Sequence, residues 1–183
     1  YAKSYHAQNV GKLVAQEQLE EFVSMVNPPA RVLDVGSGPG HDSAYLSNKY
    51  SVTGIEPSKS FYEIACYDCP EVEFINADVV NYDIGVNQYK GIWARDSLHH
   101  IHEAELDNVF RKLSNSRVEG GILYAIVREG EGEILEKETK AYTDEDGLER
   151  FYHLFTGQEL TNRAEKAGLK LVKLDHTQRS HKW

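Results

Sequence analysis

The sequence contains little cysteine and no long apolar run, and each shortage excludes a class of protein. Two cysteines in 183 residues cannot form the disulfide framework of a small secreted domain. Cys66 and Cys69 make one C-x-x-C pair without the further ligands of a zinc site, so we expect incidental thiols, with a redox or metal role as the alternative. No stretch reaches the roughly 18 apolar residues of a membrane-spanning helix, and no secretory signal pattern is present.

Positive charge is also scarce. The chain has 20 Lys and Arg against 29 Asp and Glu, which gives a net charge of −9 and a pI near 5.4. This acidic balance opposes binding to nucleic acid or anionic lipid, because clustered basic side chains hold both. We therefore expect a small-molecule ligand and a single cytoplasmic domain over residues 1–183, without nucleic acid or membrane partners. The composition indicates no oligomeric state.

Apolar spacing predicts alternating helices and strands. A helical period covers residues 8–26 and stops before Pro28 and Pro29. Short apolar strands then alternate with helices, and this alternation requires parallel strands. The strands are expected at residues 31–35, 51–57, 72–78, 89–96 and 120–127, and the helices at residues 41–50, 58–68 and 102–115.

The last third of the chain departs from this pattern. Residues 128–146 are charged and lack periodicity, which is typical of a surface excursion. A helix then begins at the capping-box pair Thr156 and Glu159 and ends at Gly168. Residues 169–174 alternate and predict a sixth strand. The sequence therefore predicts an α/β, doubly wound fold with a mostly parallel sheet and helices on both faces.

The turn after the first strand is rich in glycine. In a doubly wound sheet the ligand binds beyond the carboxyl ends of the strands, and Gly36, Gly38 and Gly40 lie there. The dinucleotide fingerprint G-x-G-x-x-G fails, because His41 stands where its last glycine is required. A phosphate loop would need a lysine after Gly40, and none is there. Both phosphate-binding interpretations are therefore weak.

Four segments in order resemble the motifs of class I S-adenosylmethionine-dependent methyltransferases of the small bacterial type. They are VLDVGSGPG at 32–40, GIEPS at 54–58, NADV at 76–79 and WARDSLHHI at 93–101. The resemblance spans most of the chain and implies the Rossmann-like methyltransferase fold, with sheet order 3-2-1-4-5-7-6. Little sequence follows the expected sixth strand, so the antiparallel seventh strand is expected to be short or missing.

The resemblance implies S-adenosylmethionine as cofactor. Glycines let the backbone approach its methionine portion, and a carboxylate suits its positive sulfur. Asp34 is expected beside the methionine amino group, or else as a capping carboxylate that orders the turn. Glu56 is expected on the ribose hydroxyls, with a solvated loop glutamate as the alternative. Asp78 is expected on the adenine amino group, with a turn aspartate as the alternative. The other cofactor residues implied are Gly36, Ser37, Gly38, Gly40, Pro57, Val79 and Arg95.

The acceptor site is expected at the end of the fourth strand, where residues 95–101 lie near the transferred methyl group. Methyl transfer needs few catalytic groups, because the sulfonium is already activated. His100 is the candidate general base, with a structural role as the main alternative. The catalytic candidates are His100, Arg95 and Tyr152, and no metal site is expected.

Arginines and tyrosines supply the candidates for acceptor binding. Arg95, Arg128 and Arg150 would gather guanidinium groups over the pocket and favour an anionic acceptor, unless they are ordinary surface arginines. Tyr5 and Tyr152 resemble aromatic residues that cover the cofactor or wall the substrate in this family, although either could serve packing alone. The substrate candidates are Tyr5, Arg128, Arg150 and Tyr152.

Together these features favour an enzyme that transfers a methyl group in line from S-adenosylmethionine to a small molecule. The main alternative is a methyltransferase-like domain that binds the cofactor and acts as a regulator without catalysis. An NAD-dependent oxidoreductase is disfavoured by His41. The segment ARDS stands where DNA amino-methylating enzymes have an N-P-P-aromatic motif. The net negative charge of the chain also disfavours a DNA substrate.

Overall fold

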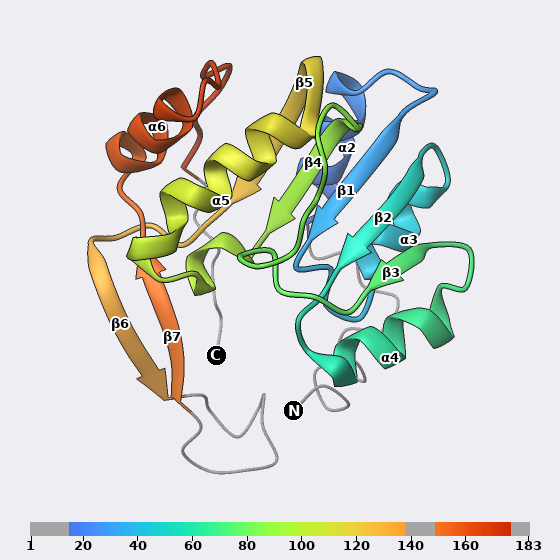
Figure 1. Cartoon of the computed structure of the whole chain (residues 1–183), viewed down its shortest axis with the longest axis horizontal. Coiled ribbons are helices and arrows are strands. Elements are labelled where there is room, and N and C mark those ends of the chain that lie inside the picture. Colours follow the sequence, from blue (N-terminus) through green and yellow to red (C-terminus); the bar gives the residue numbers. More distant parts are fainter. Residues whose placement is uncertain (1–14, 138–148, 177–183) are drawn as a thin grey trace.

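Five parallel strands form the main sheet in the order β3-β2-β1-β4-β5 (Figure 1). The structure is a computed structural model that describes residues 15–137 and 149–176. The strands are β1 Arg31–Val35, β2 Ser51–Ile55, β3 Glu73–Ile75, β4 Tyr89–Arg95 and β5 Arg117–Ile126. The predicted strands at these places and the parallel, doubly wound α/β fold are confirmed.

Helices cover both faces of the sheet, as predicted. They are α2 Gln16–Met25, α3 His41–Ser47, α4 Lys59–Asp68, the short 3₁₀ helix η1 Leu98–His100, α5 Glu103–Ser116 and α6 Gly157–Lys166. Figure 1 shows α5 in front of the sheet and α2 and α3 behind it. Successive residues of the central strands enter opposite cores, because side chains alternate along a strand. Leu33 and Ile92 pack with α5, whereas Val32 and Trp93 pack with α2 and α3.

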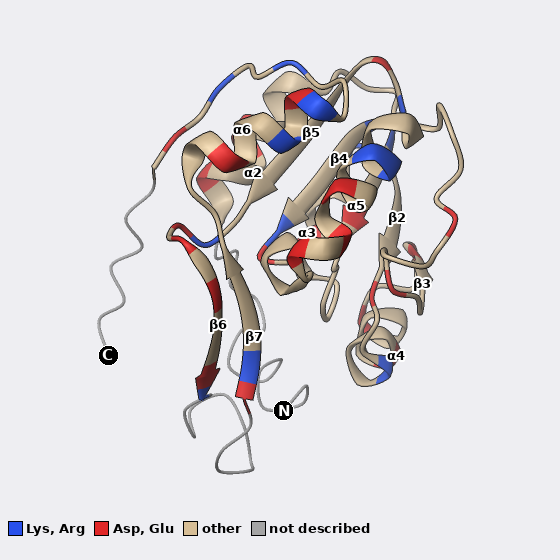
Figure 2. Cartoon of the chain, turned by 60° about the vertical axis from the view of Figure 1, so that its left-hand side comes forward, with Lys and Arg blue, Asp and Glu red and all other residues tan. Residues whose placement is uncertain are grey.

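The C-terminal helix begins and ends where the sequence predicts. Thr156 caps α6 by accepting a hydrogen bond from the Glu159 amide at 3.1 Å. Ion pairs then join α6 to α5, since Asp107 accepts from Arg163 at 2.8 Å and from Lys166 at 2.5 Å. Figure 2 shows the acidic residues of α5 and the basic residues of α6 that make this contact possible.

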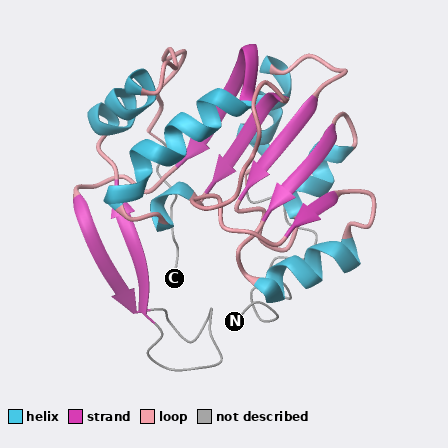
Figure 3. Ribbon diagram, viewed as in Figure 1, coloured by secondary structure: helices cyan, strands magenta, loops and turns pink. Residues whose placement is uncertain are grey.

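A two-stranded antiparallel hairpin stands apart from the main sheet (Figure 3). It pairs β6 Gly132–Lys137 with β7 Glu149–Leu154, and β7 lies against η1. The prediction of an irregular excursion over 128–146 is therefore wrong for residues 132–137, and residues 138–148 lie outside the described part. The strand β7 was also not predicted. Its position beside η1 brings Phe151 and Tyr152 to the carboxyl ends of the sheet strands.

Residues 169–174 do not form the sixth strand that their alternation predicts. Leu171, Val172 and Leu174 are exposed instead, and the main sheet ends at β5 within the described residues. Any seventh strand would follow residue 176 and lies outside them, so the 7-6 part of the expected order is not seen. None of the helices in the described ranges is long and apolar enough to cross a membrane.

Candidate functional site

The glycine loop leaves β1 in a left-handed backbone conformation. Gly36 and Gly38 have φ of +71° and +54°, values that residues with a Cβ rarely adopt. A Cβ on Gly36 would lie 2.5 Å from the Cβ of Ser97, so the loop is tight where it meets the end of β4. At Gly38 no atom of the described residues lies within 4 Å of such a Cβ. The loop is thus closely packed at one glycine and open to a ligand at the next.

Glu56 lies directly after β2 and is 6% exposed. One of its carboxylate oxygens accepts from the Gly38 amide at 2.8 Å and the other from the Ser58 amide at 2.7 Å. Burial raises the pKa of Glu56, and these two amides oppose the rise. A carboxylate can accept about four hydrogen bonds, so Glu56 keeps the capacity to bind hydroxyl groups in the cleft that it lines beside Pro57.

Other residues expected at the cofactor make contacts within the fold. Asp34 is buried, does not line the cleft and accepts from the Ser43 hydroxyl at 2.6 Å. Burial and the Asp42 charge raise the pKa of Asp34 to about 7. Asp78 accepts from the Val80 amide at 2.8 Å, as a turn aspartate does. These contacts are the ones that the structural alternatives for Asp34 and Asp78 expect, and the cofactor roles of both residues stay predictions. Gly40 and Val79 likewise do not line the cleft within the described residues.

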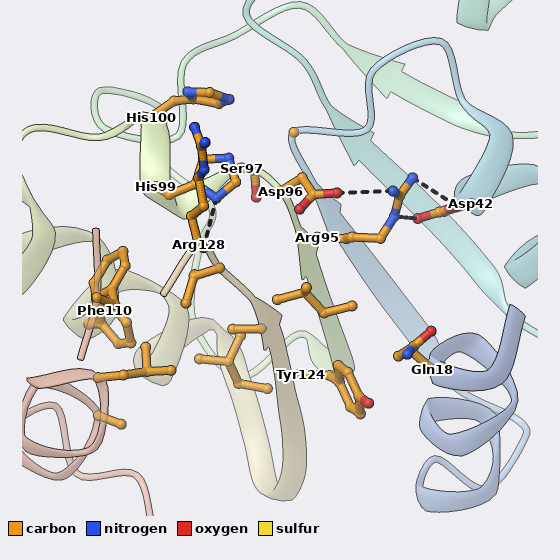
Figure 4. Close-up of a pocket in the computed structure, with 18 of the residues that line it drawn as sticks. Gln18, Asp42, Arg95, Asp96, Ser97, His99, His100, Phe110, Tyr124 and Arg128 are labelled. Carbon is orange, nitrogen blue, oxygen red and sulfur yellow. Dashed lines mark hydrogen bonds and ion pairs between the residues drawn. The ribbon is translucent and has the colours of Figure 1, made fainter. Parts of the chain in front are cut away.

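Arg95 is held between two carboxylates at the end of β4 (Figure 4). Its Nε lies 2.6 Å from Asp42, and a second guanidinium nitrogen lies 3.1 Å from Asp96. Asp42 also accepts from the indole nitrogen of Trp93 at 2.9 Å. Asp42 was not predicted as a site residue, because an aspartate in the first turn of a helix is also explained by the helix dipole. It ties α3 to β4 beside the glycine loop.

Two adjacent histidines of η1 are fixed in opposite tautomers. Nδ1 of His99 accepts from the Arg128 amide at 3.2 Å, so it carries no proton. Nδ1 of His100 lies 2.9 Å from the Phe151 carbonyl oxygen, which can only accept, so this nitrogen does carry the proton. Burial lowers the pKa of His99 to about 3 and also lowers the pKa of His100. Both rings are therefore neutral near pH 7, and the unprotonated nitrogen of His100 is Nε2.

The acceptor candidates on the hairpin lie beside these histidines. The Tyr152 ring centroid is 4.8 Å from that of His100 and 4.5 Å from the guanidinium carbon of Arg128. Arg128 also pairs with Glu136. The Arg150 charge acts on His99 and on His100. Tyr5 lies outside the described residues.

One cleft collects most of the predicted site residues. It extends from α2 along β5 to α6 and residues 168–176, and at the carboxyl ends of the strands it is lined by Gly36, Ser37, Gly38, Glu56, Pro57, Arg95, Asp96, Ser97, His99, His100, Arg128, Arg150 and Tyr152. Among residues 15–137 and 149–176, no group of three or more His, Cys, Asp or Glu is placed to hold a metal ion. The Phe151 carbonyl was missed, because any residue type supplies a carbonyl and no sequence signal marks it.

Comparisons with known proteins agree with this arrangement. A family model described as a methyltransferase domain matches residues 32–121. A Methanosarcina mazei S-adenosylmethionine-dependent methyltransferase has a TM-score of 0.70 at 18% identity, with 79% of this chain and 81% of that chain covered. The DhpI complex with S-adenosylhomocysteine has a TM-score of 0.71 at 21% identity, with 91% and 81% covered.

A third similar structure contains two bound ligands. Burkholderia thailandensis 1,6-didemethyltoxoflavin-N1-methyltransferase, with bound 1,6-didemethyltoxoflavin and S-adenosylhomocysteine, has a TM-score of 0.65 at 22% identity. The alignment covers 90% of this chain and 72% of that chain. No curated protein sequence matches the chain. Residues 32–121 therefore match a methyltransferase domain, and the chain shares the fold of S-adenosylmethionine-dependent methyltransferases.

Proposed function

We propose that the protein transfers a methyl group from S-adenosylmethionine to a small molecule bound in the cleft at the carboxyl ends of the strands. The observation that carries this proposal is the position of His100. It lines the same cleft as Gly38 and Glu56, and it presents an unprotonated Nε2 as a neutral base. A glycine loop and a candidate general base in one cleft suit methyl transfer to an N–H or O–H group.

The residues of the glycine loop fit S-adenosylmethionine. Gly38 borders open space, and Glu56 beside it offers carboxylate oxygens to the ribose hydroxyls. The hydroxyls of Ser37 and Ser97 are buried without a hydrogen-bond partner among the described residues, which fits a polar ligand bound next to them. The bound cofactor supplies a methyl group already activated by the sulfonium. Gly36, Ser37, Gly38 and Glu56 would hold it, with Pro57 at the edge.

His100 and Tyr152 act on the acceptor. His100 Nε2 takes the proton from the acceptor heteroatom, while the Phe151 carbonyl keeps the ring oriented through Nδ1. The Tyr152 ring lies next to His100 and provides an apolar wall for a flat acceptor. The heteroatom must then face the methyl group in line, so orientation supplies most of the rate.

The expectation of an anionic acceptor, which the sequence favours, is weakened by the ion pairs of its arginines. It rests on three guanidinium groups, but Arg95 pairs with Asp42 and Asp96, and Arg128 pairs with Glu136. Arg150 also lines the cleft, and its charge acts on His100. A small-molecule acceptor of either charge is compatible with the acidic chain, whereas a long nucleic acid is not.

The proposal also includes the extent of the domain and the cellular compartment, which rest on less specific features. We propose one methyltransferase domain over residues 1–183 and a cytoplasmic location. Two free cysteines, of which Cys66 is exposed, fit a reducing compartment.

The test is a transfer assay with methyl-labelled S-adenosylmethionine and pooled metabolites. We expect labelled product with the wild-type protein and a much smaller amount of labelled product with the variant His100→Asn. Cofactor binding without any labelled product would instead favour the regulatory, non-catalytic alternative. Labelled product formed equally by both proteins would keep the activity but remove His100 from the reaction.

A further inference from the structure

The hairpin of β6 and β7 carries part of the site at a distance from the place where it joins the sheet. At its base the Phe155 amide donates to the Arg128 carbonyl at 2.9 Å, and the Phe155 carbonyl accepts from the Gly130 amide at 3.1 Å. Phe151 lies four residues earlier in the chain, which is roughly 13 Å along an extended strand. The contact of the Phe151 carbonyl with His100 therefore depends on what fixes β7 between these two points.

Pairing with β6 does not by itself fix the position of β7. An isolated two-stranded hairpin is marginally stable in water, and every residue of β6 is exposed. Figure 1 shows the hairpin projecting away from α5 and α6. Side-chain contacts between β7 and the body of the domain are therefore needed to keep the strand in one place.

His153 makes such a contact between Phe151 and the base of the hairpin. The residue is 2% exposed, and its Nε2 lies 2.8 Å from a carboxylate oxygen of Glu159 in the first turn of α6. Burial raises the pKa of Glu159, but hydrogen bonds from Arg163 and His153 outweigh this effect and hold the pKa below its ordinary value. Glu159 is therefore a carboxylate, which can only accept, so Nε2 of His153 donates.

Glu159 is itself held in place by the contact between α6 and α5. Arg163 donates to the same Glu159 oxygen at 2.8 Å and to Asp107 of α5, also at 2.8 Å. The side chain of Arg163 is 13% exposed, so this pairing lies largely within the helix contact. The hydrogen bond of His153 thus joins β7 to two helices that are already tied to each other.

The partner strand is tied to the body of the domain at the same level. Glu133 of β6 pairs directly across from His153, and one of its carboxylate oxygens lies 3.9 Å from His153 Nδ1. The same oxygen accepts from the Glu103 amide at 3.0 Å, at the start of α5. Both strands of the hairpin are therefore attached to helices at the level of His153.

We propose that His153 is a positioning residue for methyl transfer. Its hydrogen bond to Glu159 holds β7 where the Phe151 carbonyl meets Nδ1 of His100. It thereby selects the tautomer in which Nε2 of His100 is the free base. His153 does not line the cleft, so it acts on the reaction through Phe151 and His100. The inference rests on the proposed function, because it takes His100 as the base.

The test reads the protonation of His100 directly. Nitrogen NMR of the full chain with isotope-labelled histidine, without ligand, reports which ring nitrogen carries the proton, and the variant His100→Asn identifies the His100 signals. The wild-type protein should show His100 protonated at Nδ1 alone. The variant His153→Phe keeps a flat ring to pack on Phe155 but cannot donate to Glu159, so both tautomers of His100 should appear.

The same variant should also lose activity without losing the cofactor. With methyl-labelled S-adenosylmethionine at saturation and pooled metabolites, the rate of labelled product should fall about 10- to 100-fold in His153→Phe, the range for a misplaced catalytic group. The affinity for S-adenosylhomocysteine, measured by calorimetry, should not change, because Gly38 and Glu56 belong to other elements.

Three further variants separate this role from a general loss of stability. His153→Gln keeps a donor to Glu159 through its side-chain amide, so it should retain the single tautomer of His100 and most of the wild-type rate. Glu159→Ala removes the acceptor without changing β7, and it should show both tautomers. The matched control is Asp107→Ala, which breaks the ion pairs between α5 and α6 but leaves Glu159 in place for His153. This control should keep the single tautomer.

The outcomes distinguish this inference from the proposed function. A wild-type protein that neither binds S-adenosylhomocysteine nor forms labelled product would overturn the proposed function, whatever the spectra show. With an active wild type, a folded His153→Phe protein that keeps either the single His100 tautomer or the wild-type rate would reject the role of His153. If that variant does not fold, Glu159→Ala decides in the same way. Both tautomers in the wild type or in Asp107→Ala would also reject it.

Discussion

Nδ1 of His100 lies 2.9 Å from the carbonyl oxygen of Phe151, so the hairpin decides which nitrogen of this ring carries the proton. A carbonyl cannot donate, and Nε2 is therefore left as the base. His99, its neighbour in sequence, has the opposite tautomer because Nδ1 accepts from the Arg128 amide. The two histidines differ in role because different backbone groups of β7 and of the segment after β5 contact them.

Replacing His100 with Asn should lower kcat about 100-fold or more, the usual range for loss of a general base. The Asn side-chain amide can still donate to the Phe151 carbonyl, so the hairpin should stay in place. Affinity for S-adenosylhomocysteine, measured by calorimetry, should not change. A variant with full kcat would show that His100 is structural.

The pH profile gives an independent check on the same residue. Burial lowers the pKa of His100 below its ordinary value of 6.5. Wild-type kcat/KM should therefore be level near pH 7 and fall only as the pH drops below this lowered pKa, where Nε2 becomes protonated. The acid limb should be missing from the residual activity of His100→Asn. An acid limb shared by both proteins would assign it to another group.

Replacing Glu56 with Gln should weaken binding of S-adenosylhomocysteine by about 1 to 3 kcal/mol, the cost of removing a charged hydrogen-bond acceptor. The amide group of Gln also cannot accept from both the Gly38 and Ser58 amides, as the carboxylate does at 2.8 and 2.7 Å. Calorimetry measures the affinity. An unchanged Kd would place the ribose contact on another residue.

Replacing Asp42 with Ala should lower the free energy of unfolding by about 3 kcal/mol, because a buried partner of a charge is lost. Asp42 accepts from Arg95 at 2.6 Å and from Trp93 at 2.9 Å. The matched control is Glu63→Ala, which removes an ion pair to Lys59 with both side chains exposed. Urea unfolding should show a loss below about 1 kcal/mol for the control. Similar losses in both variants would contradict the role given to Asp42.

Asp34 should make stability depend on pH. Its pKa is raised from 3.8 to about 7, so the folded protein keeps a proton that the unfolded chain has lost between these values. The stability from this group is fully present below about pH 4 and is lost as the pH rises to about 7. Urea unfolding at pH 5 and pH 8 should show this loss in the wild type, and Asp34→Asn should lack it. Equal pH dependence in both proteins would contradict the assignment.

The central sheet was predictable because strong local signals bound its elements. Pro28 and Pro29 stop the first helix, and the glycines from Gly36 onward end β1. Both ends of this strand are therefore fixed by the sequence. The apolar segments of β1 and β4 are buried on both faces and pair with neighbours on both sides. Local pattern and tertiary packing therefore agree at these strands.

The hairpin and the last segment were mispredicted because alternation does not identify a pairing partner. Every residue of β6, Gly132–Lys137, is exposed, so burial imposed no apolar pattern on it. Residues 169–174 alternate well, but no strand of the described part pairs with them. In the site, spacing predicts the glycine loop and Glu56, and both line the cleft. The ion pairing of Arg95 depends on Asp42, which is 53 residues away in the sequence, and no local pattern records it.

The most direct test of the account is calorimetry of the purified protein with S-adenosylhomocysteine and, separately, with NAD. The open backbone at Gly38 and the carboxylate of Glu56 suit a nucleoside without a pyrophosphate, and His41 stands where a dinucleotide loop needs glycine. We expect a Kd in the micromolar range for S-adenosylhomocysteine and no heat of binding with NAD. Binding of NAD together with no response to S-adenosylhomocysteine would contradict it.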